Sequence, residues 1–167
     1  MKYLTTVFLI LFGLTAYGQV GFSVAYGTSN TFGFDGYIID GSDNRFHFGF
    51  ASQSNGQKAK VVKERLANYG TTRIEDGEFF WLLDFGYSKI IKEKFTIHSE
   101  LSIGQRNDFT TYEDNRFTDG GYSLVNYSKT AGGIGVYAGY LFNYNFETFV
   151  GYHTTKKLTF GVRFQIY

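Results

Sequence analysis

The feature that most constrains the fold is a period-two alternation of apolar and polar residues that recurs along the chain after residue 19. In the last such segment Leu158, Phe160, Val162, Phe164 and Ile166 share one face, and Thr159, Gly161, Arg163 and Gln165 share the other. Successive side chains of a β-strand point to opposite sides, so the pattern indicates strands with one apolar face. It recurs at residues 20–26, 32–38, 46–50, 79–88, 95–104, 133–142 and 146–153. The sequence predicts an all-β fold of about eight antiparallel strands.

The connections between these segments differ in length on the two sides. Short turns are predicted at residues 41–44, 92–94 and 143–145, and the other side carries long excursions at 53–76 and 106–129 and short loops near 28–30 and 155–157. Outer-membrane barrels have short periplasmic turns and longer extracellular loops. An even strand number with both ends on one side also allows the sheet to close, which leaves no unpaired edge in lipid. We therefore expect an up-and-down transmembrane β-barrel.

The two faces of the strands indicate which side meets lipid. The apolar face carries no formal charge in the central part of any strand; Lys89, beside a turn, is the nearest exception. The other face holds Gly residues and the charges Asp35, Arg45, Asp84, Glu100, Glu147 and Arg163. An eight-stranded interior is only wide enough for the side chains that fill it, so the aromatic face is predicted to point outward. A soluble barrel with the faces inverted is the alternative. Bulky inward residues predict a filled, non-conducting lumen: Tyr37, Phe80, Leu82, Tyr137 and Phe149.

Residues 1–18 have the pattern of a secretory signal peptide. Lys2 supplies a positive start, residues 4–14 are apolar, and Ala16 and Gly18 are small residues at the cleavage positions. This predicts a signal at 1–18 and a barrel domain at 19–167. A single membrane anchor is the alternative, although the stretch is short and lacks a following basic flank. The chain has no Cys, which excludes disulfides and thiolate metal sites, and its net charge of +1 gives no basis for nucleic-acid binding.

Taken together, these features make the chain resemble the small eight-stranded outer-membrane barrels typified by the OmpA membrane domain and OmpX. The junction at residues 16–19 is also similar to those of exported proteins from Bacteroidota. The resemblance implies a location in the outer membrane, contact with its lipid and lipopolysaccharide, and recognition of the last strand by the barrel-insertion machinery. In the family that strand ends in an aromatic residue in phase with the apolar row. Here Tyr167 is one residue out of phase with Phe164 and Ile166, and these three residues form the expected insertion signal.

The inward charges are the first candidates for chemistry. Asp84 and Glu100 fall at near-opposite positions, and paired carboxylates can perform acid–base catalysis. The alternative, which we favour, is a buried network in which Arg45 and Arg163 neutralise the carboxylates, because an unpaired buried charge is costly. The predicted network is Asp35, Arg45, His47, Asp84, His98, Glu100, Glu147 and Arg163. His47, His98 and His153 lie on strands that are not neighbours, so no shared zinc site is expected, and no other metal or cofactor.

An enzymatic alternative comes from the lipid A deacylase barrels, which use His, Ser and Glu. His98-Ser99-Glu100 contains these residue types, but His98 and Ser99 alternate to opposite faces and cannot form a hydrogen-bonded pair. We therefore expect no enzymatic activity.

The long loops are the expected working surface, since loops on a rigid scaffold commonly carry binding. Lys58, Lys60, Lys63 and Arg65 are candidates for contacts with lipopolysaccharide phosphates, or are an ordinary solvated strand extension or short helix. Asp119-Gly120-Gly121 predicts a hairpin tip, so the strands flanking it are expected to project beyond the membrane as a ribbon whose edge can recruit a partner. The predicted role is structural or surface-interacting. An accessory subunit of a larger outer-membrane complex is the alternative, and a lipid-modifying enzyme a further one.

Overall fold

The computed structural model describes residues 19–40, 44–53, 59–143 and 145–166. They form the strands β1 (Gln19–Gly27), β2 (Thr31–Ile39), β3 (Asn44–Gln53), β4 (Lys60–Val62), β5 (Arg73–Ile91), β6 (Phe95–Glu113), β7 (Gly121–Asn143), β8 (Phe146–His153) and β9 (Lys157–Ile166). Within these ranges we find no helix with the length and apolar character needed to cross a membrane. The expected signal peptide at 1–18 lies outside the described residues and stays a prediction.

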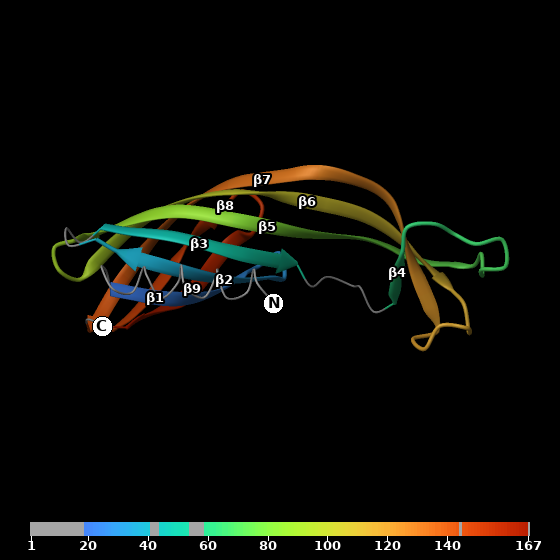
Figure 1. Ribbon diagram of the computed structural model, residues 1–167, viewed down its shortest axis with the longest axis horizontal. Helices are drawn as coiled ribbons and strands as arrows, with labels where there is room; N and C mark the ends of the chain where they lie inside the picture. Colours follow the sequence, from blue (N-terminus) through green and yellow to red (C-terminus); the bar gives the residue numbers. More distant parts are fainter. Residues whose placement is uncertain (1–18, 41–43, 54–58, 144, 167) are drawn as a thin grey trace, which may run out of the picture.

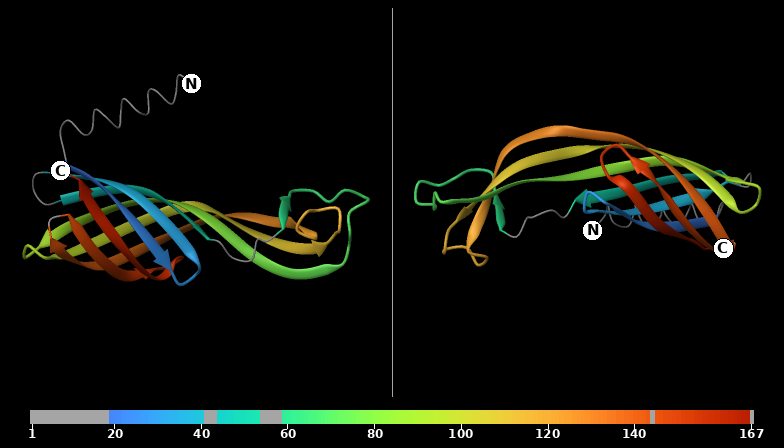
Figure 2. Two further views of the ribbon diagram at one scale, coloured as in Figure 1. Left: turned by 90° about the horizontal axis from the view of Figure 1, so that it is seen from below. Right: turned by 180° about the vertical axis from the view of Figure 1, so that it is seen from behind.

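Eight of the strands close into one antiparallel ring (Figures 1 and 2). Its order is β1, β2, β3, β5, β6, β7, β8 and β9, with β9 returning to pair with β1. Val20 lies opposite both Ile38 and Ile166, so the start of β1 and the end of β9 lie at the same end of the barrel. Closure gives every strand of the barrel a partner on both sides. The predicted all-β, eight-stranded, up-and-down barrel is confirmed.

The alternation sorts the side chains as the sequence predicts. The outward residues Phe48, Leu101 and Val136 are 55%, 60% and 63% exposed, whereas the inward Arg45 and Asp84 are 2% and 0% exposed. Such an apolar exterior is incompatible with a soluble barrel, because soluble monomers do not expose contiguous apolar surface on this scale. The bulky inward residues Tyr37, Phe80, Leu82, Tyr137 and Phe149 are all buried.

Aromatic residues also mark the two rims of the apolar surface. Tyr26, Trp81 and Tyr152 lie toward the end of the barrel away from Gln19 and Ile166, and Tyr87 and Tyr140 lie toward the other end. Tyr and Trp are enriched at both interfaces of membrane barrels, because one end of each ring is apolar and the other is wet. The surface between these rims is the expected bilayer contact.

β5, β6 and β7 continue beyond the barrel and form an extension (Figure 1, right). β3 pairs with β5 only as far as Trp81, and the earlier part of β5 pairs with β6 alone. β4 adds to the far part of β7 in parallel, with Lys60 opposite Tyr122. The predicted ribbon is therefore present as an extension of the barrel, but it is a sheet of four strands, because β4 pairs with β7.

An aromatic cluster holds the tip of the extension together. Tyr69 packs on Tyr122 and Phe117, with ring centroids 5.0 and 5.2 Å apart, and Tyr122 is fully buried. The Tyr122 hydroxyl donates to the Gly70 carbonyl at 2.7 Å, and the Gly70 amide donates to Asp114 at 2.8 Å. These contacts fix the chain before β5 against the tip.

Candidate functional site

The polar side chains of the lumen form two layers: a lower layer at the end away from the extension and an upper layer nearer to it. The lower layer is centred on Glu147 on β8. Arg45 on β3 donates to one of its carboxylate oxygens, and Arg163 on β9 donates to the other at 3.1 Å. The Thr96 hydroxyl on β6 donates to the same carboxylate at 2.5 Å. Arg163 also lies over the ring of Phe149, 5.1 Å from its centroid. The predicted pairing of these two arginines with Glu147 is thus present.

The upper layer is neutralised by Lys156, which the sequence did not single out. This residue lies in the turn between β8 and β9, and its side chain enters the lumen, where it donates to Asp84 at 2.6 Å and to Glu100 at 2.7 Å. The prediction that Arg45 and Arg163 neutralise Asp84 and Glu100 is therefore wrong. The strand alternation gave no signal for Lys156, because a turn residue has no assigned face.

The carboxylates of the upper layer do not form an isolated catalytic pair. Asp84 lies opposite Ser102, and Glu100 lies opposite Gly86, so the two are diagonal neighbours on β5 and β6 with the Lys156 ammonium between them. The remaining inward carboxylate, Asp35, accepts a hydrogen bond from Ser23 at 2.7 Å. An ammonium shared between two buried carboxylates offsets part of the cost of burying them, which fits a structural network.

A Ser, His and Asp arrangement in the lumen has the wrong hydrogen-bond direction for catalysis. His153 Nδ1 accepts from the backbone amides of Thr155 and Lys156, both at 3.1 Å, so its proton resides on Nε2. Nε2 therefore donates to Ser102 Oγ at 3.0 Å, and Ser102 donates to Asp84. A nucleophilic serine must instead donate its proton to the histidine.

In the segment with the residue types of the lipid A deacylases, His98 and Ser99 point to opposite faces, as expected. Ser99 is on the exposed face and donates to the Tyr87 carbonyl at 3.4 Å, whereas His98 is buried in the lumen. The two side chains are on opposite sides of the barrel wall.

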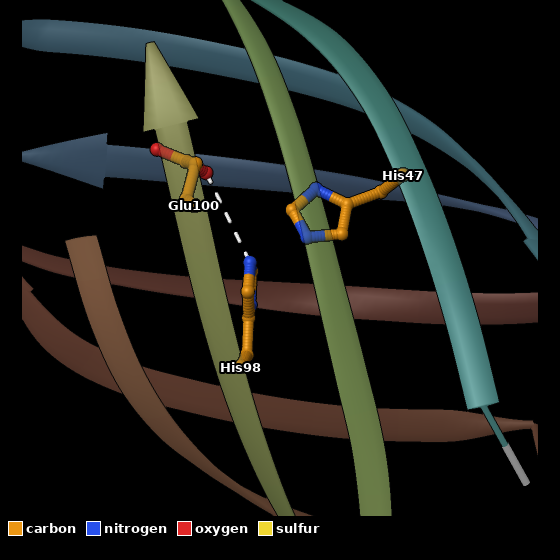
Figure 3. A group of neighbouring side chains, drawn as sticks. All are labelled: His47, His98 and Glu100. Carbon is orange, nitrogen blue, oxygen red and sulfur yellow. Dashed lines mark ion pairs between the residues drawn. The ribbon is translucent and has the colours of Figure 1, made fainter. Parts of the chain in front are cut away.

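Two histidines lie together, contrary to expectation (Figure 3). β5 separates β3 from β6, yet the rings of His47 on β3 and His98 on β6 meet with their centroids 4.1 Å apart. Glu100 lies beside them, with one carboxylate oxygen 3.9 Å from His98 Nε2. The expectation that non-neighbouring strands keep these residues apart is wrong, because side chains from all strands meet in the narrow interior of an eight-stranded barrel. His153 is bonded elsewhere, to Ser102.

The predicted basic loop residues lie on the extension. Lys60 is in β4, and Lys63 and Arg65 follow it; all three are exposed, whereas Lys58 lies outside the described residues. The segment is a short strand rather than a helix. Lys63 also lines a cavity of about 510 Å³ together with Trp81 and Tyr127.

These cations differ from the others on the extension in having no ion-pair partner among the described residues. The other cations are paired: Arg73 with Asp76, Arg106 with Glu78, Arg116 with Asp114 and Lys129 with Asp108. The acidic residue Asp114 is occupied by Arg116 and Gly70, and Arg116 holds the pKa of this carboxyl below its ordinary value.

The proposed insertion residues lie at the end of β9. Phe164 and Ile166 are on the outward face, 38% and 55% exposed, and Tyr167 lies outside the described residues. Their role in insertion stays a prediction.

Comparison with known proteins supplies the fold. No protein-family model matches the chain, and no curated protein matches it. The crystal structure of Ail, the attachment invasion locus protein of Yersinia pestis, is similar over 89% of this chain and 95% of that chain, with 15% sequence identity and a TM-score of 0.54. The structure of Ail in a phospholipid bilayer nanodisc has the same identity of 15% and TM-score of 0.54, and covers 99% of that chain. Ail in complex with the heparin analogue sucrose octasulfate has 13% identity and a TM-score of 0.52, over 89% of this chain and 96% of that chain. At these identities the likeness concerns the fold, which is that of an outer-membrane β-barrel.

Proposed function

We propose that this chain is a non-enzymatic outer-membrane protein that uses its extension to bind phosphate or sulfate groups at the cell surface. The observation that carries the proposal is that Lys60, Lys63 and Arg65 have no ion-pair partner within the described part of the chain. The other described cations of the extension are paired with carboxylates. Unpaired exposed cations remain available for charge-assisted hydrogen bonds with anionic oxygens.

The position of these cations supports a ligand in or near the outer leaflet. The extension leaves the barrel at the end opposite the start of β1 and the end of β9, which is the extracellular end in outer-membrane barrels. The cavity beside Lys63 includes Trp81, one of the aromatic residues at that rim. Because aromatic girdles mark the membrane interfaces, we expect lipopolysaccharide phosphates near this rim.

Sulfated polysaccharides present the same chemistry from outside the cell. Ail has been crystallised with the heparin analogue sucrose octasulfate. That ligand was bound by Ail and not by this chain. It is nevertheless a suitable probe, so that binding of a sulfated ligand can be compared with binding of lipopolysaccharide.

The experiment compares two triple variants in nanodiscs. Lys60→Gln, Lys63→Gln and Arg65→Gln remove the proposed site, and Lys89→Gln, Lys92→Gln and Lys94→Gln remove the same charge at the opposite end of the barrel. Binding of purified lipopolysaccharide and of sucrose octasulfate is measured at low and at physiological salt. We expect the first variant to lose salt-dependent binding of at least one of the two ligands and the second to retain it. Equal binding by both variants, or no binding by the unmodified protein, contradicts the proposal.

The second candidate is an accessory subunit, and the free edge of β5 favours it. Residues 73–80 pair with β6 on one side, and no described strand pairs with the other. An unpaired edge can accept a strand from a partner. However, Arg73, Glu75, Asp76 and Glu78 place charges along it, and charged edges resist such pairing. A protein that co-purifies with the unmodified chain after native extraction, and is lost when Gly77 is replaced by Pro, would favour this candidate.

A further inference from the structure

The meeting of His47, His98 and Glu100 in the lumen has the composition of a metal site (Figure 3). One potential ligand atom from each residue lies within 4.8 Å of the other two. We propose that these three residues bind one divalent transition-metal ion of the zinc class. Two imidazoles and one carboxylate are a donor set that zinc uses in proteins.

The donor atoms are buried and poorly partnered. Both ring nitrogens of His47 and Nε2 of His98 are buried and form no hydrogen bond of normal geometry, although the Ser99 carbonyl lies near the His47 ring. His47 and His98 are only 5% and 2% exposed. Buried polar atoms are almost always hydrogen-bonded, so three unpartnered nitrogens in one cluster require an explanation. A metal ion shared by the two rings supplies one.

Glu100 divides its two carboxylate oxygens between the network and the cluster. Oε1 accepts from the Lys156 ammonium at 2.7 Å and from the Tyr137 hydroxyl at 3.1 Å. Oε2 faces His98 Nε2 at 3.9 Å. Ligation through Oε2 therefore leaves the contacts with Lys156 and Tyr137 in place, and these contacts orient the carboxylate toward the histidines.

The formal charges of the lumen are close to balanced with or without a divalent ion. The buried inward carboxylates of the barrel are Asp35, Asp84, Glu100 and Glu147, and the buried inward cations are Arg45, Lys156 and Arg163. Among the described residues the lumen thus has one more carboxylate than it has cations. Glu100 already accepts from Lys156, and Asp35 is the carboxylate held by a hydroxyl in place of a cation. A divalent ion would change the formal balance of these seven groups from −1 to +1, an imbalance of the same size.

Arg163 sets a condition on binding. Its guanidinium donates to His98 Nδ1 at 2.9 Å, which places the His98 proton on Nε2. Ligation through Nε2 transfers this proton to Nδ1 and breaks the bond from Arg163, which keeps its contact with Glu147 at 3.1 Å. His47 and His98 come from β3 and β6 and are buried in the closed barrel. We therefore expect the ion to bind before the barrel has closed.

The test uses the full chain, free of affinity tags and folded into detergent with ZnCl₂ present, followed by removal of loose metal and measurement of zinc per barrel. The chain has three histidines, which makes the control complete. We expect one zinc ion per unmodified barrel, loss of it in His47→Gln and in His98→Gln, and retention in His153→Gln, whose two ring nitrogens are already bonded.

Folding of each variant is checked by its heat-modifiable migration on gels. If the His47 or His98 variant does not fold, the visible absorption of the unmodified protein folded with Co²⁺ decides, because nitrogen and oxygen ligation in a closed site gives a characteristic spectrum. A wild-type barrel that takes up no stoichiometric zinc and shows no such spectrum overturns the proposal. So does zinc that remains in both folded variants, or that is lost equally from His153→Gln.

Discussion

The Lys156 ammonium lies 2.6 Å from an Asp84 carboxylate oxygen inside the barrel, although 72 positions separate the two residues in the chain. This contact joins the turn between β8 and β9 to the opposite wall, and the same ammonium reaches Glu100. The lumen beneath the extension therefore holds this buried charge in addition to the apolar cluster of Ala51, Phe80, Leu82 and Ala131.

Replacing Lys156 by Met should destabilise the barrel strongly, because Asp84 and Glu100 would remain buried without their cation. Removal of one partner of a buried pair costs about 3–5 kcal/mol. The measurement is the free energy of unfolding in urea and detergent. Lys129→Met is the matched control: its pair with Asp108 is exposed, and we expect a loss of less than about 1 kcal/mol. Equal losses in the two variants would show that the Lys156 contacts contribute nothing beyond a surface pair.

The filled lumen should not conduct ions. Tyr37, Tyr137 and Phe149 are 3%, 3% and 5% exposed, so their rings occupy the interior. Purified protein in a planar bilayer is expected to give no large, steady conductance. A reproducible open level that scales with salt concentration would refute a lumen closed by side chains.

The tip of the extension should loosen in acid. Arg116 lowers the pKa of Asp114, so this carboxylate stabilises the tip fully above its ordinary pKa of about 3.9, and the contribution is lost as pH falls toward the depressed value. At neutral pH, Asp114→Ala should speed hydrogen exchange of the Gly70 amide, which donates to this carboxylate at 2.8 Å. Asp119→Ala removes a nearby charge and should leave that exchange rate unchanged. Equal protection of Gly70 in both variants would contradict the assignment.

The end of β9 should matter for insertion more than its beginning. Phe164→Ser with Ile166→Ser removes two outward apolar residues near the chain end, and Leu158→Ser with Phe160→Ser removes two from the other end of the same row. If the insertion machinery recognises the last residues, the first pair should lower the heat-modifiable fraction in membranes more than the second. Equal fractions would indicate that only the apolar area of the strand counts.

The alternation of apolar and polar residues predicted which side chains point outward and inward. It did not predict which inward side chains contact one another. The outward position of Phe48 and the inward position of His47 follow from the strand period alone. The contact of His47 with His98 does not, because the period gives a residue's side and not its height or position around the lumen. Lys156 was missed for a related reason: it belongs to a turn, and only the closed barrel brings that turn over Asp84. The return of β4 to β7 likewise depends on a long-range pairing that three residues cannot signal locally.

The central claim, a barrel with its apolar face in lipid and its charges inside, is tested most directly by spin-label accessibility along β6. The chain has no Cys, so single cysteines can be introduced without background. Labels at Ile97 and Leu101 should collide with oxygen dissolved in the bilayer, and labels at Thr96 and Ser102 should be shielded from both oxygen and water-soluble relaxants. A label at Lys129, in the part of β7 that belongs to the extension, should be open to water. Water-accessible labels at Ile97 and Leu101, or lipid-exposed labels at Thr96 and Ser102, would contradict the account.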